Sequence, residues 1–187
     1  MFKFVLLCVL TLCSAVVIAD PVTEDLYQID VIIFEHNDPK RFKAEQWPNF
    51  IAPLELKNTQ SLATTDTLVK VEANQRLLNS EAGVLRRSKD QRVIEQLSWR
   101  QVLPLNAKQI PVYIQCGKDD KEIEALISVK PLRTQFEVSV DAIYHDQADS
   151  REFRITRDIK TKKKEMFYLD HPIIGMMVMV SPVTPAS

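Results

Sequence analysis

Two apolar patterns divide the first half of the chain. Residues 27–34 (YQIDVIIF) are mostly β-branched or aromatic, and the turn-forming residues 36–39 (HNDP) follow them. Such a run predicts a strand buried on both faces, in the centre of a sheet. From about Ala73 to Lys89 the apolar residues recur at helical spacing instead, which predicts one amphipathic helix. The apolar positions of that helix are Leu77, Leu78, Ala82, Val84 and Leu85.

After Asp90 apolar and polar residues alternate, as in strands with one buried and one solvated face. The connections between these strands are too short for crossover helices, so neighbouring strands are expected to run antiparallel as a meander. The fold class is therefore α+β, with a largely antiparallel β-sheet, a meander in the C-terminal half and one main helix. The predicted strands are 92–99, 110–116, 122–130, 134–144, 152–160, 165–169 and 173–180.

The first residues have the pattern of a secretory signal. Lys3 precedes an apolar run that is too short for a membrane span, and small residues lead to Ala19. We expect cleavage after Ala19, so that residues 1–19 are a signal peptide and residues 20–187 form a single periplasmic α+β domain. The alternative is a buried apolar N-terminal strand or helix. No later stretch approaches 18 uninterrupted apolar residues, so the sequence predicts no membrane span in the mature chain.

Composition narrows the possible functions. The 24 basic and 25 acidic residues nearly balance, which gives no basic excess to attract a nucleic acid. With 3 glycines, all far apart, the chain has no Gly-rich phosphate loop. Once the signal is removed Cys116 is the last cysteine, so no internal disulfide is possible, and we interpret it as a buried strand residue.

Motifs for catalysis are missing from the sequence. There is no G-x-S-x-G elbow, no S-x-x-K and no H-E-x-x-H, so we predict no reaction, no cofactor and no metal site. The cluster Asp170-His171-Pro172 could suggest acid-base chemistry. Adjacent side chains rarely face each other, and we interpret the cluster as a turn in which the carboxylate accepts backbone N–H groups.

Basic residues gather near the C-terminal third of the chain. Strand alternation places Arg154, Lys160 and Lys162 on one face, where they could meet an anionic polymer. The simpler interpretation is a solvated face that pairs across the sheet with Glu137 and Asp141.

The two tryptophans could stack on sugars. Trp47 lies in a Pro-containing segment, 42–66, that we interpret as a long surface loop and a candidate functional loop. Trp99 follows Leu97 at strand spacing, which is also typical of a core position.

Four stretches taken in order carry a family resemblance. They lie behind the signal and span most of the mature chain: residues 27–35 (YQIDVIIFE), 45–48 (EQWP), 98–101 (SWRQ) and 168–175 (YLDHPIIG). In this set the chain resembles the CsiV family of gammaproteobacterial periplasmic proteins.

The resemblance implies a non-enzymatic, peptidoglycan-associated protein. Such a protein would support cell-wall synthesis through the lipoprotein activator of a class A penicillin-binding protein. If glycan is bound, Trp99, Arg100, Tyr168 and His171 are the expected stacking and polar contacts. Lys160 and Lys162 would attract the carboxylates of the stem peptides.

Two alternatives belong to other classes. An envelope hydrolase could use Asp170, His171 and His145 if the three residues met beside a cleft. A structural partner in an outer-membrane assembly would instead show an exposed apolar patch near residues 173–180.

Overall fold

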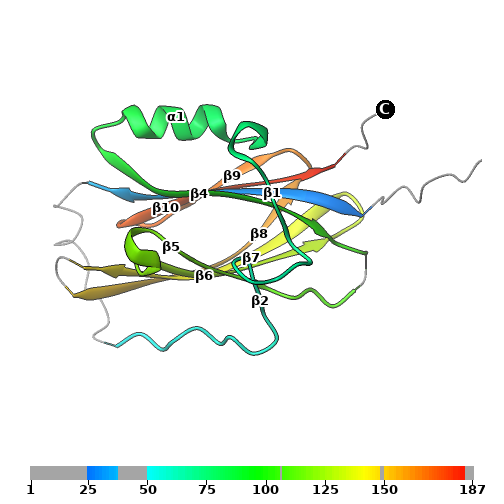
Figure 1. Ribbon diagram of the computed structural model, residues 1–187, viewed down its shortest axis with the longest axis horizontal. Coiled ribbons are helices and arrows are strands. Elements are labelled where there is room, and N and C mark those ends of the chain that lie inside the picture. Colours follow the sequence, from blue (N-terminus) through cyan, green and yellow to red (C-terminus); the bar gives the residue numbers. More distant parts are fainter. Residues whose placement is uncertain (1–24, 38–49, 106, 148–149, 184–187) are drawn as a thin grey trace, which may run out of the picture.

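The described part of the chain is a two-sheet sandwich with the helix α1 (Asn79–Arg87) on its outer surface (Figure 1). The computed structural model describes residues 25–37, 50–105, 107–147 and 150–183. The expected signal peptide and Trp47 lie outside these residues. Within them, no helix is both long enough and apolar enough to cross a membrane.

Each sheet has five strands. Sheet A has the order β3 (Val69–Lys70), β4 (Gln91–Val102), β1 (Leu26–His36), β10 (Ile174–Pro182) and β9 (Met166–Asp170). Sheet B has the order β2 (Gln60–Ser61), β5 (Val112–Cys116), β6 (Ile123–Pro131), β7 (Gln135–Asp146) and β8 (Arg151–Lys162). The helical elements are η2 (Ala73–Gln75), α1 (Asn79–Arg87) and η3 (Lys118–Asp120). All pairings are antiparallel except the short parallel pair β2–β5.

The predicted central strand is confirmed as β1, which lies between β4 and β10. Ile29, Val31 and Ile33 join the core that fills the space between the two sheets. Ile32 and Phe34 point the other way and pack under α1. The strand is apolar on both faces because each face is covered, one by sheet B and the other by the helix.

The α+β class is confirmed, and so is the antiparallel meander from β5 to β8. The last two strands do not continue that meander. Although only residues 163–165 separate β8 from β9, the strand β9 pairs with β10 in sheet A. The C-terminal half therefore contributes to both layers and closes the sandwich along one side.

The helix is shorter than the predicted span of residues 73–89. Its buried residues are Ala82 and Leu85, which pack with Leu78 against sheet A, whereas Leu77 and Val84 are exposed. Polar side chains of β1 hold the backbone of residues 75–77, at the end of η2 and before α1, in a path that is not α-helical. Gln28 donates to the Gln75 carbonyl at 3.0 Å, and Asp30 accepts from the Leu77 backbone N–H at 2.8 Å.

Candidate functional site

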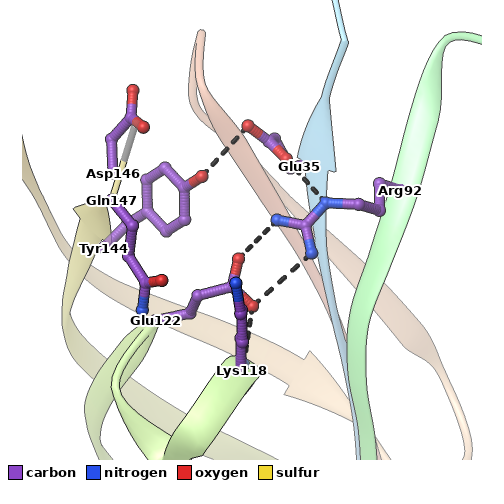
Figure 2. A pocket seen from close by; sticks show the side chains of 7 residues that line it. All are labelled: Glu35, Arg92, Lys118, Glu122, Tyr144, Asp146 and Gln147. Carbon is purple, nitrogen blue, oxygen red and sulfur yellow. Dashed lines mark hydrogen bonds and ion pairs between the residues drawn. The ribbon is translucent and has the colours of Figure 1, made fainter. Parts of the chain in front are cut away.

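A polar cavity of about 450 Å³ lies at one end of the sandwich, between the two sheets. We call it the charged cavity. Glu35 and Arg92 reach it from sheet A, and Tyr144 and Asp146 reach it from sheet B. Its complete lining is Glu35, Arg92, Lys118, Glu122, Tyr144, Asp146 and Gln147 (Figure 2). The cavity therefore combines two basic and three acidic side chains.

Arg92 joins the two sheets inside this cavity. Its Nε donates to Glu35 Oε2 at 2.8 Å, and its Nη2 donates to Glu122 Oε1 at 2.6 Å. Figure 2 shows the guanidinium between these two carboxylates. A guanidinium has five N–H donors, so Arg92 has capacity for contacts with a ligand as well.

Tyr144 completes the network from the opposite sheet. Its hydroxyl donates to Glu35 Oε1 at 3.0 Å, across a sequence separation of 109 residues. Burial raises the pKa of Tyr144, and the nearby Glu35 carboxylate raises it further. The phenol therefore stays protonated and acts as a fixed donor, with its oxygen lone pairs available as acceptors.

The tight turn between β5 and β6, residues 117–121, shapes the cavity wall. Gly117 has φ 88° and ψ −159°, which essentially only glycine adopts, and Asp119 and Asp120 also have positive φ. This path aims the Lys118 backbone N–H at Glu122 Oε2, at 2.9 Å. The turn thus fixes the carboxylate that holds Arg92.

Glu122 is kept ionised by its neighbours. Burial raises its pKa, but the hydrogen bonds from Arg92 and from the Lys118 backbone outweigh that effect, so the pKa lies below its ordinary value. In turn the hydrogen bond to Glu122 raises the pKa of Arg92. Glu122 and Arg92 are consequently held in fixed positions in the cavity, and both are charged.

The structure places Trp99 in the core between the sheets, with 0% of its surface exposed. Its indole N–H donates to Gln101 Oε1 at 3.2 Å. A glycan on the protein surface cannot stack on this ring, so Trp99 is a core residue rather than part of a surface site. The neighbouring Arg100 is half-buried, and its Nη2 donates to Gln75 Oε1 at 3.4 Å.

Tyr168 lies at the same end of the sandwich as the charged cavity, on the outer side of sheet A, and His171 lies in the turn that follows β9. The Tyr168 ring stacks on Phe34 with centroids 5.9 Å apart, and its hydroxyl donates to Asp170 Oδ1 at 2.9 Å. In this turn it is His171 Nδ1 that accepts the Ile173 backbone N–H, at 3.3 Å, whereas the sequence suggested the Asp170 carboxylate as the acceptor. Burial, followed by the positive charge of Arg157, lowers the pKa of His171.

Lys160 and Lys162 lie elsewhere. Phe153 and Ile155 of β8 face the core, so alternation puts both lysines on the outer face of sheet B, where they are exposed. On the same face Arg154 binds Asp141 through two hydrogen bonds of 2.8 and 2.7 Å. The structure therefore does not bring the six residues expected from the sequence into one site.

The histidines and acids of the hydrolase alternative have other partners. Asp170 Oδ1 lies 3.5 Å from His36 Nε2, and His145 Nδ1 lies 3.0 Å from Glu152 Oε1. Within the described ranges, no group of three or more His, Cys, Asp or Glu residues is placed to hold a metal ion. Cys116 is buried on β5, and burial raises its pKa to about 12, which makes the thiol unreactive.

The apolar patch expected for an outer-membrane partner is not at residues 173–180. Ile173, Ile174, Met176, Val178 and Val180 are all in the core. Met177 and Met179 are half-buried beside α1. That stretch is therefore a central strand rather than an exposed surface.

Comparison with known families identifies the chain. The sequence model of the family described as "Peptidoglycan-binding protein, CsiV" matches residues 4–142. The chain belongs to the CsiV family. No curated protein and no solved structure gives a significant match.

The CsiV match includes most of the charged cavity. Glu35, Arg92, Lys118 and Glu122 lie inside residues 4–142, and Tyr144 comes two positions after its end. Tyr168, His171 and both lysines of β8 lie beyond it. Four of the seven residues that line the charged cavity therefore lie in the matched part of the chain.

The lowered pKa of Glu122 predicts a pH dependence of stability. A carboxyl whose pKa is lowered by folding contributes stability above its ordinary pKa, 4.5 for this group, and that contribution is lost as the pH falls through the lowered value. The Glu122→Gln variant is expected to lose about 1–3 kcal/mol at neutral pH. Between about pH 5 and pH 2 the unfolding free energy of the wild type should fall as Glu122 is protonated, and that of Glu122→Gln should fall less.

Urea denaturation at several pH values measures both effects. The raised pKa of Asp30, caused mainly by burial, acts in the opposite direction, but it is common to both proteins and cancels in the comparison. Parallel pH profiles for the wild type and Glu122→Gln would show that Glu122 is not held by Arg92 in solution.

Proposed function

We propose that this protein is a non-enzymatic periplasmic adaptor that binds peptidoglycan at the charged cavity and supports cell-wall synthesis. Peptidoglycan is proposed as the bound polymer because the chain belongs to a family described as peptidoglycan-binding. The observation that carries the proposal is the cavity itself, where Arg92 and Lys118 face Glu35, Glu122 and Asp146 at an open end of the sandwich.

The mixed charge of the cavity favours the peptide part of peptidoglycan. Stem peptides carry carboxylates, and those with a diamino acid also carry an ammonium group. A carboxylate can approach Arg92 and Lys118, while an ammonium can approach Asp146 or Glu35. A neutral sugar would desolvate these charges without replacing their hydration, which is costly.

The adaptor role is supported by the resemblance to the CsiV family alone. We infer that the protein acts with the lipoprotein activator of a class A penicillin-binding protein. Tyr168 and Arg100, on the outer face of sheet A, and His171, in the turn after β9, remain proposed contacts. Tyr168 is the most accessible of the aromatic residues proposed for the site, with 43% of its surface exposed.

Reversing one charge at the cavity should weaken binding to cell-wall sacculi. We expect Lys118→Glu to lower the affinity about tenfold, because the added carboxylate repels the stem peptides and competes for Arg92. The measurement is co-sedimentation of residues 20–187 with purified sacculi. Raising the salt concentration should weaken binding of the wild type, because charge attraction is screened.

The matched control is Lys121→Glu, which makes the same change in the same turn but outside the cavity. It should leave sacculus binding within about twofold of the wild type. Equal losses in both variants would mean that net charge, and not the cavity, governs binding. If the double variant Lys160→Gln/Lys162→Gln lost binding while Lys118→Glu bound normally, the binding site would lie on β8 and not at the charged cavity.

Two further readouts test the rest of the proposal. Muropeptides released into the supernatant would show that the protein is an enzyme, contrary to the proposal. Capture of the purified chain by the immobilised lipoprotein activator would support the adaptor role. Sacculus binding without such capture would leave a peptidoglycan-binding protein that is not an adaptor for this activator.

A further inference from the structure

A second cavity, of about 320 Å³, opens along the side of the sandwich. We call it the side cavity. It lies where β4 of sheet A and β5 of sheet B, which both run near the same side of the sandwich, approach each other. Its size falls within the range of small-molecule pockets, about 300–1,000 Å³.

The chemistry of the side cavity differs from that of the charged cavity. Leu62, Leu97 and Ile114 give it an apolar wall, whereas Ser61, Lys70 and Asp120 are polar residues of its lining. An amino sugar has the complementary surface, because its ring has an apolar face and its edge carries hydroxyl and acetamido groups. Pockets for such ligands combine an apolar lining with a few placed polar groups.

Arg76 supplies a donor at this wall. Its Nη1 donates to the Gln96 carbonyl at 2.5 Å, while its Nε is buried and has no hydrogen-bond partner among the described residues. A buried donor without an acceptor is costly. A ligand that brings carbonyl and hydroxyl oxygens to the Arg76 guanidinium would offset part of that cost.

One turn separates the two cavities. Within residues 117–121, Lys118 lines the charged cavity and Asp120 lines the side cavity. In peptidoglycan the stem peptide is joined covalently to an amino sugar, so adjoining cavities of these two kinds match adjoining parts of one polymer. We propose that the side cavity binds the amino sugar next to the peptide held in the charged cavity. This inference rests on the proposed function.

The test uses separate probes for the two cavities. A neutral tetramer of N-acetylglucosamine probes the side cavity, and a sugar-free stem tripeptide ending in a diamino acid probes the charged cavity. Ala63 lines the side cavity but is exposed, so Ala63→Phe should fill the cavity without disturbing the core. Ala107→Phe, at an exposed site on the connection between β4 and β5, is the matched control.

Isothermal titration calorimetry, with circular dichroism to verify folding, gives the result. We expect Ala63→Phe to weaken tetramer binding about tenfold and to change tripeptide binding by less than about twofold. Ala107→Phe should bind both probes like the wild type. Lys118→Glu should show the opposite pattern, losing the tripeptide and retaining the tetramer.

Two results would overturn the inference while leaving the proposed function intact. One is tripeptide binding without any tetramer binding by the wild type. The other is tetramer binding that Ala63→Phe and Ala107→Phe affect equally. Failure of the wild type to bind sacculi, tripeptide and tetramer would instead contradict the proposed function, and the inference with it.

Discussion

Replacing Trp99 by alanine is expected to lower the free energy of unfolding by about 3–5 kcal/mol. The indole is completely buried between the sheets, and its removal would leave a large cavity in the core. Gln101 Oε1 would also lose the donor that now lies at 3.2 Å. Urea denaturation followed by circular dichroism measures the change.

The companion variant Trp99→Phe separates a core role from a ligand-binding role. Phenylalanine keeps most of the buried apolar volume but lacks the indole N–H, so a smaller loss of stability is expected. Once folded, Trp99→Phe should bind sacculi as the wild type does. A folded Trp99→Phe protein that failed to bind would mean that the indole touches the ligand after all.

Replacing Gly117 by alanine is expected to damage both stability and binding. The backbone conformation at Gly117 costs a residue with a Cβ about 1–3 kcal/mol. That Cβ would also lie only 2.5 Å from Glu122 Cβ and 2.6 Å from Glu122 Oε2. Glu122 would have to move away from Arg92, so sacculus binding should fall about tenfold or more.

Gly83 provides the matched glycine-to-alanine control. It lies inside α1, and the nearest atom to an added Cβ is the flexible end of Arg87 at 3.5 Å. Gly83→Ala should therefore raise stability by about 0.5–1 kcal/mol, because glycine is a poor helix former. A thermal melt that showed Gly117→Ala to be as stable as Gly83→Ala would contradict the role given to the turn.

The sequence predicts where the strands lie better than it predicts which strands pair with one another. The continuous apolar run of β1 and the alternation along β6 and β7 indicate which side chains are buried, and the structure agrees. Alternation fixes the faces of a strand but not the strand beside it. The separation of β8 and β9 into different sheets, across a short connection, therefore cannot be predicted from the pattern.

The helix boundary depended on contacts from a distant strand. Apolar spacing alone extends the helix back to Ala73, because Leu77 fits the helical period. In the structure Gln28 and Asp30 bind the backbone of residues 75–77. Side chains 47 residues away in sequence thus set where α1 begins.

The charged cavity could not be found from local motifs. Glu35, Arg92, Glu122 and Tyr144 come from four separate strands or strand ends, and each looks like an ordinary polar residue in its own segment. Glu35 ends the stretch 27–35 that carried the family resemblance, which was the one available signal. Trp99 also lies in a stretch that carried the family resemblance, 98–101, although its spacing fitted a core position equally well.

The position of β1 between β4 and β10 has a consequence for biogenesis. The two ends of the described chain are hydrogen-bonded neighbours, with Val183 N–H donating to the Leu26 carbonyl at 2.9 Å. Until β10 emerges, β1 has an open edge and β9 has no neighbour in sheet A. Open, apolar strand edges promote aggregation. A chain that lacks β10 therefore exposes the apolar edge of β1 and is more prone to aggregate than the complete fold.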